Sequence, residues 1–296
     1  MWVFLALAAA LFFALVHIID EYCVDEIFAY PWLGVITSAL ASLVVFIPLP
    51  FIVPFTGWEW PKISILIIAL FAGILIQISQ LLYFNALAKT NAGIVAAYWN
   101  MIPAMLPILS YVFLNKILSP NQYSGIVLLI FASNIMLLSD HNIETRASAF
   151  LLMTGASLLQ SISYLLQDYI YENTSYIVGF VFFTIGIISV GILPLGIPYI
   201  RGKFFQSAHR LAGVIRVFLI VEILNLIALA FAQKSIEQGS PALVAAVETT
   251  IPGFTFLIGI MCLPFLKMSY DKNIVCNLGR KLSALSIMIV GVYMVS

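Results

Sequence analysis

The sequence predicts an all-α polytopic membrane protein with ten transmembrane helices, arranged as two inverted five-helix repeats. Composition is the first reason: 63% of the 296 residues are hydrophobic and 9% are charged, whereas soluble domains carry about 25% charged residues. The second reason is that apolar runs long enough to cross a bilayer recur along the whole chain. The third is a pattern of small residues around a proline that occurs once in each half.

The apolar runs predict five helices in each half of the chain. They cover roughly 2–20, 30–53, 63–88, 92–115, 121–139, 147–170, 175–199, 212–234, 240–265 and 282–296. We expect residues 1–139 and 147–296 to form the two repeats of one integral membrane domain. The longest connections would lie around 200–211 and 266–281, which leaves no room for a separate soluble domain. The first run lacks a basic leading segment and is interpreted as a retained helix rather than a signal peptide.

The fourth run carries polar and helix-breaking residues in its middle: Tyr98, Trp99, Asn100, Pro103 and Pro107. A proline removes a backbone donor and pushes away the carbonyl four residues earlier, so Pro103 frees the carbonyl of Trp99. At membrane depth a freed carbonyl is tolerated only against protein or a water-filled cavity. The run therefore predicts a bent helix beside a polar site.

The same arrangement returns in the second half of the chain. Aligning Pro103 with Pro252 places GIVAAYWNMIPA over ALVAAVETTIPG, so that Trp99 falls on Glu248. Pro252 frees the carbonyl of Glu248 in turn. Two such interrupted helices at equivalent positions are typical of transporters that bind their substrate near the bilayer midplane. We expect Pro103 and Pro252 to be gating kinks.

At these motifs the chain resembles the ten-helix drug/metabolite transporter superfamily, in its EamA-like branch. The resemblance covers most of the chain, although the motifs are loose and mostly apolar. The residues that fall on the family pattern are Ala86, Leu87, Ala92, Ala96, Pro103, Phe113, Leu114, Gly125, Pro252 and Gly291. Two departures are clear: Asn115-Lys116 replaces a Gly-Glu pair, and acidic Asp20 and Glu21 stand where the family often has a basic residue.

The distribution of basic residues bears on orientation. On the side of the termini lie three of them, Lys62, Lys116 and Lys234. On the opposite side lie ten: Lys89, Arg146, Arg201, Lys203, Arg210, Arg216, Lys267, Lys272, Arg280 and Lys281. The positive-inside rule places the termini outside, whereas the family resemblance implies that both are inside, and both orientations stay open.

Polar side chains recur at helical spacing and predict one central cavity. The stripes are Gln77 and Gln80; Gln160, Tyr164, Gln167 and Tyr171; and Glu222, Asn225 and Gln233. The candidate substrate-binding residues are Trp99, Tyr98, Asn100, Glu248, Glu222, Asn225, Gln77, Gln80, Gln160 and Tyr164. Glu248, Glu222 and His17 are the candidate proton relay.

Each candidate also has a purely structural interpretation. Gln77, Gln80, Gln160 and Asn225 would serve equally well as hydrogen-bonding contacts between helices, worth about 0.6 kcal/mol each. A neutral Glu222 bonded to Asn225 of the next turn would need no substrate. Trp99 and Tyr98 would serve as packing aromatics, and His17 as a hydrogen-bonded membrane histidine. Glu248 differs because it precedes a kink proline and because a charge at the bilayer centre costs about 2.5–3.5 kcal/mol.

These observations favour a secondary transporter of a small polar metabolite, such as an amino acid or amine, across a bacterial-type inner membrane. It would work by alternating access and would be driven by protons or by the gradient of the solute. The alternatives are a non-transporting or lipid-flipping membrane protein and an intramembrane enzyme, against which the scattered His17, His141 and His209 argue. We expect no cofactor, metal or nucleic-acid partner, a lipid environment, and a monomer or weak dimer.

Overall fold

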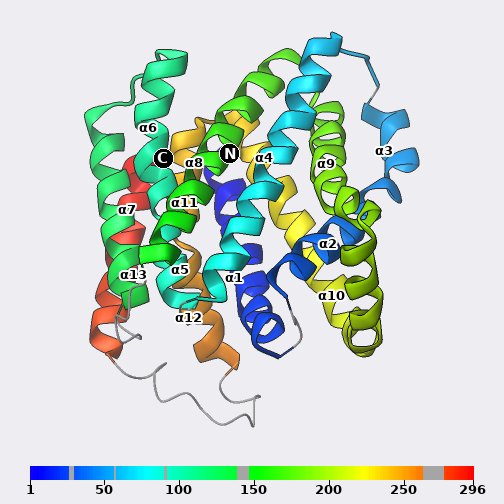
Figure 1. Cartoon of the computed structure of the whole chain (residues 1–296). Coiled ribbons are helices and arrows are strands. Elements are labelled where there is room, and N and C mark those ends of the chain that lie inside the picture. Colours follow the sequence, from blue (N-terminus) through cyan, green and yellow to red (C-terminus); the bar gives the residue numbers. More distant parts are fainter. Residues whose placement is uncertain (27–29, 57, 90–91, 139–146, 263–276) are drawn as a thin grey trace.

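The computed structural model describes all residues except 27–29, 57, 90–91, 139–146 and 263–276, and in that part of the chain every regular element is a helix (Figure 1). The all-α class is therefore confirmed. The elements are α1 (Trp2–Glu26), α2 (Pro31–Ala41), η1 (Ser42–Phe46), α3 (Leu49–Thr56), α4 (Ile63–Leu87), α5 (Ala92–Trp99), α6 (Met101–Leu114), α7 (Pro120–Leu138), α8 (Ala147–Asn173), α9 (Tyr176–Ile192), η2 (Leu193–Gly196), α10 (Pro198–Gln238), α11 (Pro241–Glu248), α12 (Ile251–Cys262) and α13 (Leu278–Val295).

The chain is an integral membrane protein by the length and hydropathy of its helices. Among the described residues, eight helices are long and apolar enough to cross a membrane, or up to nine if the bent pair of 32–46 and 49–55 is one span. The 19-residue α7 is not among the eight. The expected number of ten is therefore not confirmed.

The two proline-containing runs are each divided into two helices. In the first half α5 ends at Trp99 and α6 begins at Met101. In the second half α11 ends at Glu248 and α12 begins at Ile251. The two short helices, α5 and α11, both have eight residues. Both breaks lie within one turn before a proline, where the missing N–H and the displaced carbonyl weaken the helix.

Three expected boundaries differ from the structure. The run 30–53 is divided into α2, η1 and α3, with a bend of 47° near Pro48 and Pro50. The expected loop at 200–211 is part of α10, which begins at Pro198, because proline is favourable in the first turn of a helix. The first helix continues to Glu26, beyond the predicted residue 20.

Helices from the two halves pack against each other in a reciprocal way. In the first half, α1 packs against α10, α11 and α12 of the second. Conversely, α8 of the second half packs against α4, α5 and α6 of the first, and α7 packs along α13. Both termini lie toward the same end of the bundle (Figure 1). We call this the terminal end; the α6–α7 connection (115–119) and the last turns of α8 and α10 also lie there.

Glycines allow α4 and α9 to approach closely. A Cβ atom on Gly73 would lie 1.9 Å from the backbone oxygen of Phe183, and one on Gly186 would lie 2.1 Å from that of Leu70. Small residues permit such backbone contact between membrane helices. Since the obstructing atoms belong to the backbone, a side chain at either glycine would force the helices apart.

We therefore expect Gly73→Ala to lower the stability of the folded protein by about 1–3 kcal/mol, the usual cost of overpacking. The matched control is Gly202→Ala in α10, where an added Cβ meets nothing within 4 Å. That change should be neutral or should stabilise the helix by roughly 0.5–1 kcal/mol. Thermal unfolding in detergent measures both variants. Equal melting temperatures would contradict the close α4–α9 contact.

Candidate functional site

Glu248 lies at the break between α11 and α12, inside the helix bundle. The backbone turns away from the helix here: the Thr249 and Thr250 hydroxyls donate to the carbonyls of Ala246 and Val247, each at 2.7 Å. Such local hydrogen bonds compete with the helical pattern. The break thus leaves the Glu248 side chain at the end of a short helix, facing α8.

Tyr164 of α8 is the partner that the structure gives to this carboxyl group. Its hydroxyl donates a hydrogen bond of 2.8 Å to Oε2 of Glu248, and the tyrosine is only 3% exposed. The other carboxyl oxygen, Oε1, is buried without a hydrogen-bond partner among the described residues. A buried polar atom in this condition costs free energy. It is the natural position for a donor from a ligand.

A chain of hydrogen bonds continues from this pair toward α4. Gln160 donates from Nε2 to the Tyr164 hydroxyl at 3.4 Å, and its Oε1 lies 3.5 Å from the Ser79 hydroxyl. Ser79 also donates to the carbonyl of Ala156 at 3.0 Å. The chain therefore joins α4, α8 and α11. Ser79 was not among the predicted site residues, although its position between Gln77 and Gln80 could have indicated it.

The aromatic residues at the other break point in different directions. Trp99 stacks on Tyr83 with ring centroids 5.5 Å apart, and Tyr83 meets His17 edge-on at 6.4 Å. Trp99 also packs against both hydrophobic cores of the bundle, one of which contains Tyr164. Tyr98 instead packs edge-on against Phe150 of α8. Trp99 is thus the aromatic residue at the boundary between the two cores.

Glu222 has partners of its own. Asn225 donates to its Oε2 at 3.1 Å, and Ser38 of α2 supplies a further hydrogen bond. Glu222 is 8% exposed. No contact between Glu222 and Glu248 is found among the residues that the structure describes. The structure thus contains the hydrogen bond from Asn225 that would explain Glu222 without a substrate.

Two other candidates hold helices together. Gln77 is 2% exposed and donates to the carbonyl of Val35 at 2.9 Å, which ties α4 to α2. Asn100 accepts a hydrogen bond of 3.1 Å from Ser133 of α7. Gln80 is half-buried on α4. The structure therefore brings together Glu248, Tyr164 and Gln160, and places Gln77 and Asn100 at separate helix contacts.

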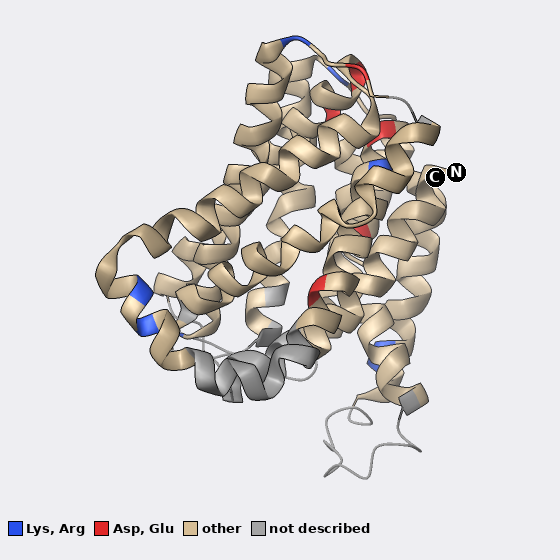
Figure 2. Ribbon diagram, turned by 90° about the vertical axis from the view of Figure 1, so that its right-hand side faces the viewer, with Lys and Arg blue, Asp and Glu red and all other residues tan. Residues whose placement is uncertain are grey.

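Charged positions divide between the interior and the ends of the bundle. Figure 2 shows acidic positions toward the terminal end and within the bundle, and basic positions at both ends. Two carboxyl groups thus lie within the bundle: Glu248 at a helix break and Glu222 between α10 and α2.

Comparisons with known proteins agree with this architecture. A solved crystal structure of a protein is 12% identical to the chain, covers 97% of it and 96% of its own length, and superposes with a TM-score of 0.64. At this identity the likeness concerns the fold alone. No curated protein matches the chain. Residues 1–138 match the family model of the EamA-like transporter family, which confirms the resemblance seen in the sequence. The matched residues, the first 138 of 296, are thus similar to the EamA-like transporter family, which is consistent with the drug/metabolite transporter superfamily.

Proposed function

We propose that the protein is a secondary transporter of a small polar metabolite that carries a protonated amine, such as an amine or amino acid. The observation that carries the proposal is Glu248 at a helix break, with one carboxyl oxygen held by Tyr164 and the other buried without a partner among the described residues. A substrate ammonium group would supply the missing donor. It would also offset part of the cost of placing a carboxyl group at membrane depth.

Trp99 would form the apolar side of the same site. It lies at the second helix break, next to both hydrophobic cores. An aromatic face attracts an ammonium group by about 0.5–2 kcal/mol, depending on desolvation. A site with a carboxyl group on one helix break and an indole on the other would favour organic cations and zwitterions over anions.

Alternating access is the mechanism that the arrangement supports. The breaks at Trp99 and Glu248 end helices of equal length in the two halves, and the packing of α1 and α8 is reciprocal. We propose that residues 1–139 and 147–296 are inverted repeats, with Pro103 and Pro252 as gating kinks. Inverted repeats around a midplane site move against each other in this class of transporter.

Proton coupling would run through Glu248. A carboxyl group that binds either a proton or a substrate cation, but not both, exchanges one for the other across the membrane. Glu222 and His17 would have supporting roles, since Glu222 already accepts hydrogen bonds from Asn225 and Ser38. The site would operate in a bacterial-type inner membrane, in a monomer or weak dimer.

Transport by purified protein in liposomes tests the proposal, with labelled amines, amino acids and a sugar as the negative substrate. Glu248→Gln should keep the fold, because the amide has nearly the same shape, and should abolish the dependence of uptake on an imposed pH gradient. Tyr164→Phe should raise KM by about tenfold, since a hydrogen bond to a charged group is worth about 1.5–3 kcal/mol. Trp99→Ala should raise KM several-fold while the pH profile is kept.

The matched control is Glu237→Gln, which removes a carboxyl group near the end of α10 and should leave uptake and its pH profile unchanged. Wild-type uptake and pH dependence in Glu248→Gln would refute the assignment of the site. Liposomes that scramble labelled lipid but accumulate no solute would instead support the lipid-flipping alternative.

A further inference from the structure

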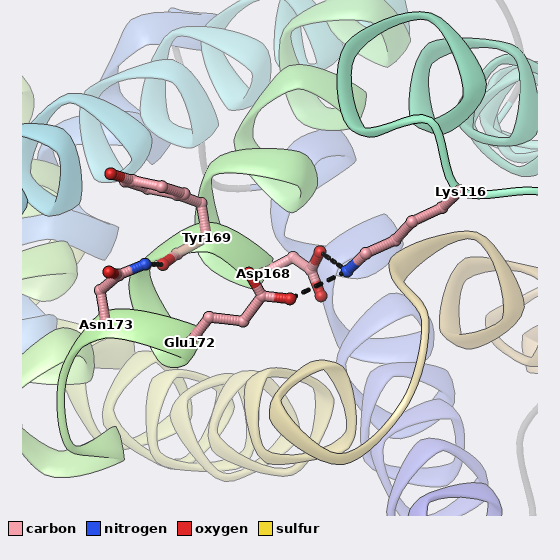
Figure 3. A network of polar contacts seen from close by, with 5 residues as sticks. All are labelled: Lys116, Asp168, Tyr169, Glu172 and Asn173. Carbon is pink, nitrogen blue, oxygen red and sulfur yellow. Dashed lines mark hydrogen bonds and ion pairs between the residues drawn. The ribbon is translucent and has the colours of Figure 1, made fainter.

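Three charged side chains form a compact network at the terminal end (Figure 3). The Lys116 ammonium lies 2.5 Å from Oδ2 of Asp168 and 3.1 Å from Oε1 of Glu172. Asp168 and Glu172 are one turn apart on α8 and so share a face of the helix. Both carboxyl groups therefore converge on the same ammonium group. We call Lys116, Asp168 and Glu172 the ion triad.

The backbone at the end of α6 directs Lys116 toward α8. Asn115 adopts a left-handed conformation with φ 51°. The N–H groups of Asn115 and Lys116 donate to the carbonyls of Tyr111 and Ser110, at 3.1 and 3.2 Å. This closes the helix in the manner of a left-handed cap, for which asparagine is the usual substitute for glycine. The Asn115-Lys116 departure from the family pattern thus has a structural role.

The ion triad crosses between the two halves of the chain. Lys116 belongs to the connection between α6 and α7, whereas Asp168 and Glu172 lie on α8. Contacts of this kind must form and break if the halves move against each other. A contact within one half has no such requirement.

The ion triad also lies between the candidate site and the terminal end. Asp168 follows Tyr164 by one turn on the same face of α8, about 6 Å further along the helix axis. Glu172 is one turn further still, and its side chain is 59% exposed. Lys116 therefore lies on this face of α8 between Tyr164 and the terminal end.

The burial of Asp168 distinguishes this network from an ordinary surface ion pair. The Asp168 side chain is 7% exposed and that of Lys116 is 39% exposed. Exposed ion pairs contribute about 0–1 kcal/mol, whereas removal of one partner from a buried pair leaves an uncompensated charge. Loss of Lys116 would leave Asp168 in that condition. Lys116 thus compensates the charge of the buried Asp168.

We propose that the ion triad is a latch that closes the terminal end of the transport path and opens once in each transport cycle. The proposal rests on the proposed alternating access. It does not depend on the identity of the substrate or on the role of Glu248.

A second ion pair at the same end offers a matched control. Lys234 pairs with Glu237 three residues later in α10, and its ammonium lies 4.8 Å from the ring centroid of Tyr176 in α9. All three residues belong to the second half. This pair also joins a lysine to a carboxyl group, but it does not join the two halves.

The stability that the charge of Lys116 provides should be present at neutral pH and should be lost in alkali. Burial lowers the pKa of Lys116, but the hydrogen bonds and charges of Asp168 and Glu172 outweigh this and raise it above the ordinary 10.5. A folded-state pKa above the unfolded value stabilises the fold fully below 10.5, and the contribution is lost as pH rises through the raised value. The melting temperature of wild type should therefore exceed that of Lys116→Gln by a constant amount from pH 7 to pH 9. A difference that vanishes within that interval would contradict this assignment.

Thiol labelling tests the latch without any substrate. Ser110 of α6 is 1% exposed, and its hydroxyl has no hydrogen-bond partner among the described residues, so Ser110→Cys is a mild reporter. It is placed in a protein whose Cys23, Cys262 and Cys276 are replaced by serine. Liposomes then receive a membrane-impermeant maleimide on both sides. We expect Lys116→Gln to raise the labelling rate about tenfold, as a closed state loses population to an open one.

Three further variants decide the interpretation. Lys116→Arg and the charge exchange of Lys116→Asp with Asp168→Lys should both label slowly, because each restores an ion pair. Lys234→Gln should label like the parent protein. Labelling of Lys116→Gln at the parent rate, or an equal increase in Lys234→Gln, would overturn the proposal. The labelling assay needs no substrate, so its result does not depend on whether Glu248→Gln abolishes transport. The latch and the proposed binding site can therefore be refuted independently.

Discussion

A carboxyl group at membrane depth must find partners, and the arrangement of the central helices follows from this requirement. Glu248 obtains one from Tyr164, which is itself held by Gln160 and, through it, by Ser79. These four residues come from three helices that pack together. The hydrogen bonds fix the rotation of α8, because a turned helix would leave the tyrosine hydroxyl buried and unpaired. Among the side-chain atoms of these four residues that are buried, Oε1 of Glu248 lacks a partner in the described part of the chain, and we propose that a ligand binds there.

The helix breaks make such a site possible. A continuous helix keeps its backbone groups bonded internally and offers a ligand side chains alone. At Glu248 the chain turns through Thr249 and Thr250, whose hydroxyls donate hydrogen bonds to backbone carbonyls. At Trp99 the chain turns through Asn100, whose side chain is held by Ser133. Each break is stabilised by different chemistry, yet both occur one turn or less before a proline.

Local sequence patterns predicted the features that depend on neighbouring residues. The proline positions predicted both breaks, and the spacing of Gln160 and Tyr164 placed them on one face of α8. The prediction of a loop at 200–211 was wrong. The charged residues at 201–210 are typical of a loop, but α10 already begins at Pro198. The pairing of Lys116 with Asp168 could not be predicted, since it joins residues 52 positions apart. The same holds for Ser79 with Gln160, which only the packing of α4 on α8 brings together.

Some contacts of α8 stay within the second half and others cross to the first half, which determines how the site would move. The hydrogen bond of Tyr164 to Glu248 lies within the second half, so it persists if that half moves as a rigid body. The contacts of α8 with Ser79 and Lys116 cross to the first half, and the proposed alternating access would require the contact with Lys116 to break. Ser79 also bonds the backbone of α8 at Ala156, which lies three turns from Asp168 along the helix. Motion about the Ser79 contact would therefore separate Asp168 from Lys116 while leaving the carboxyl group and its tyrosine together. A rocking motion of this kind would open the terminal end without dismantling the site that binds the solute.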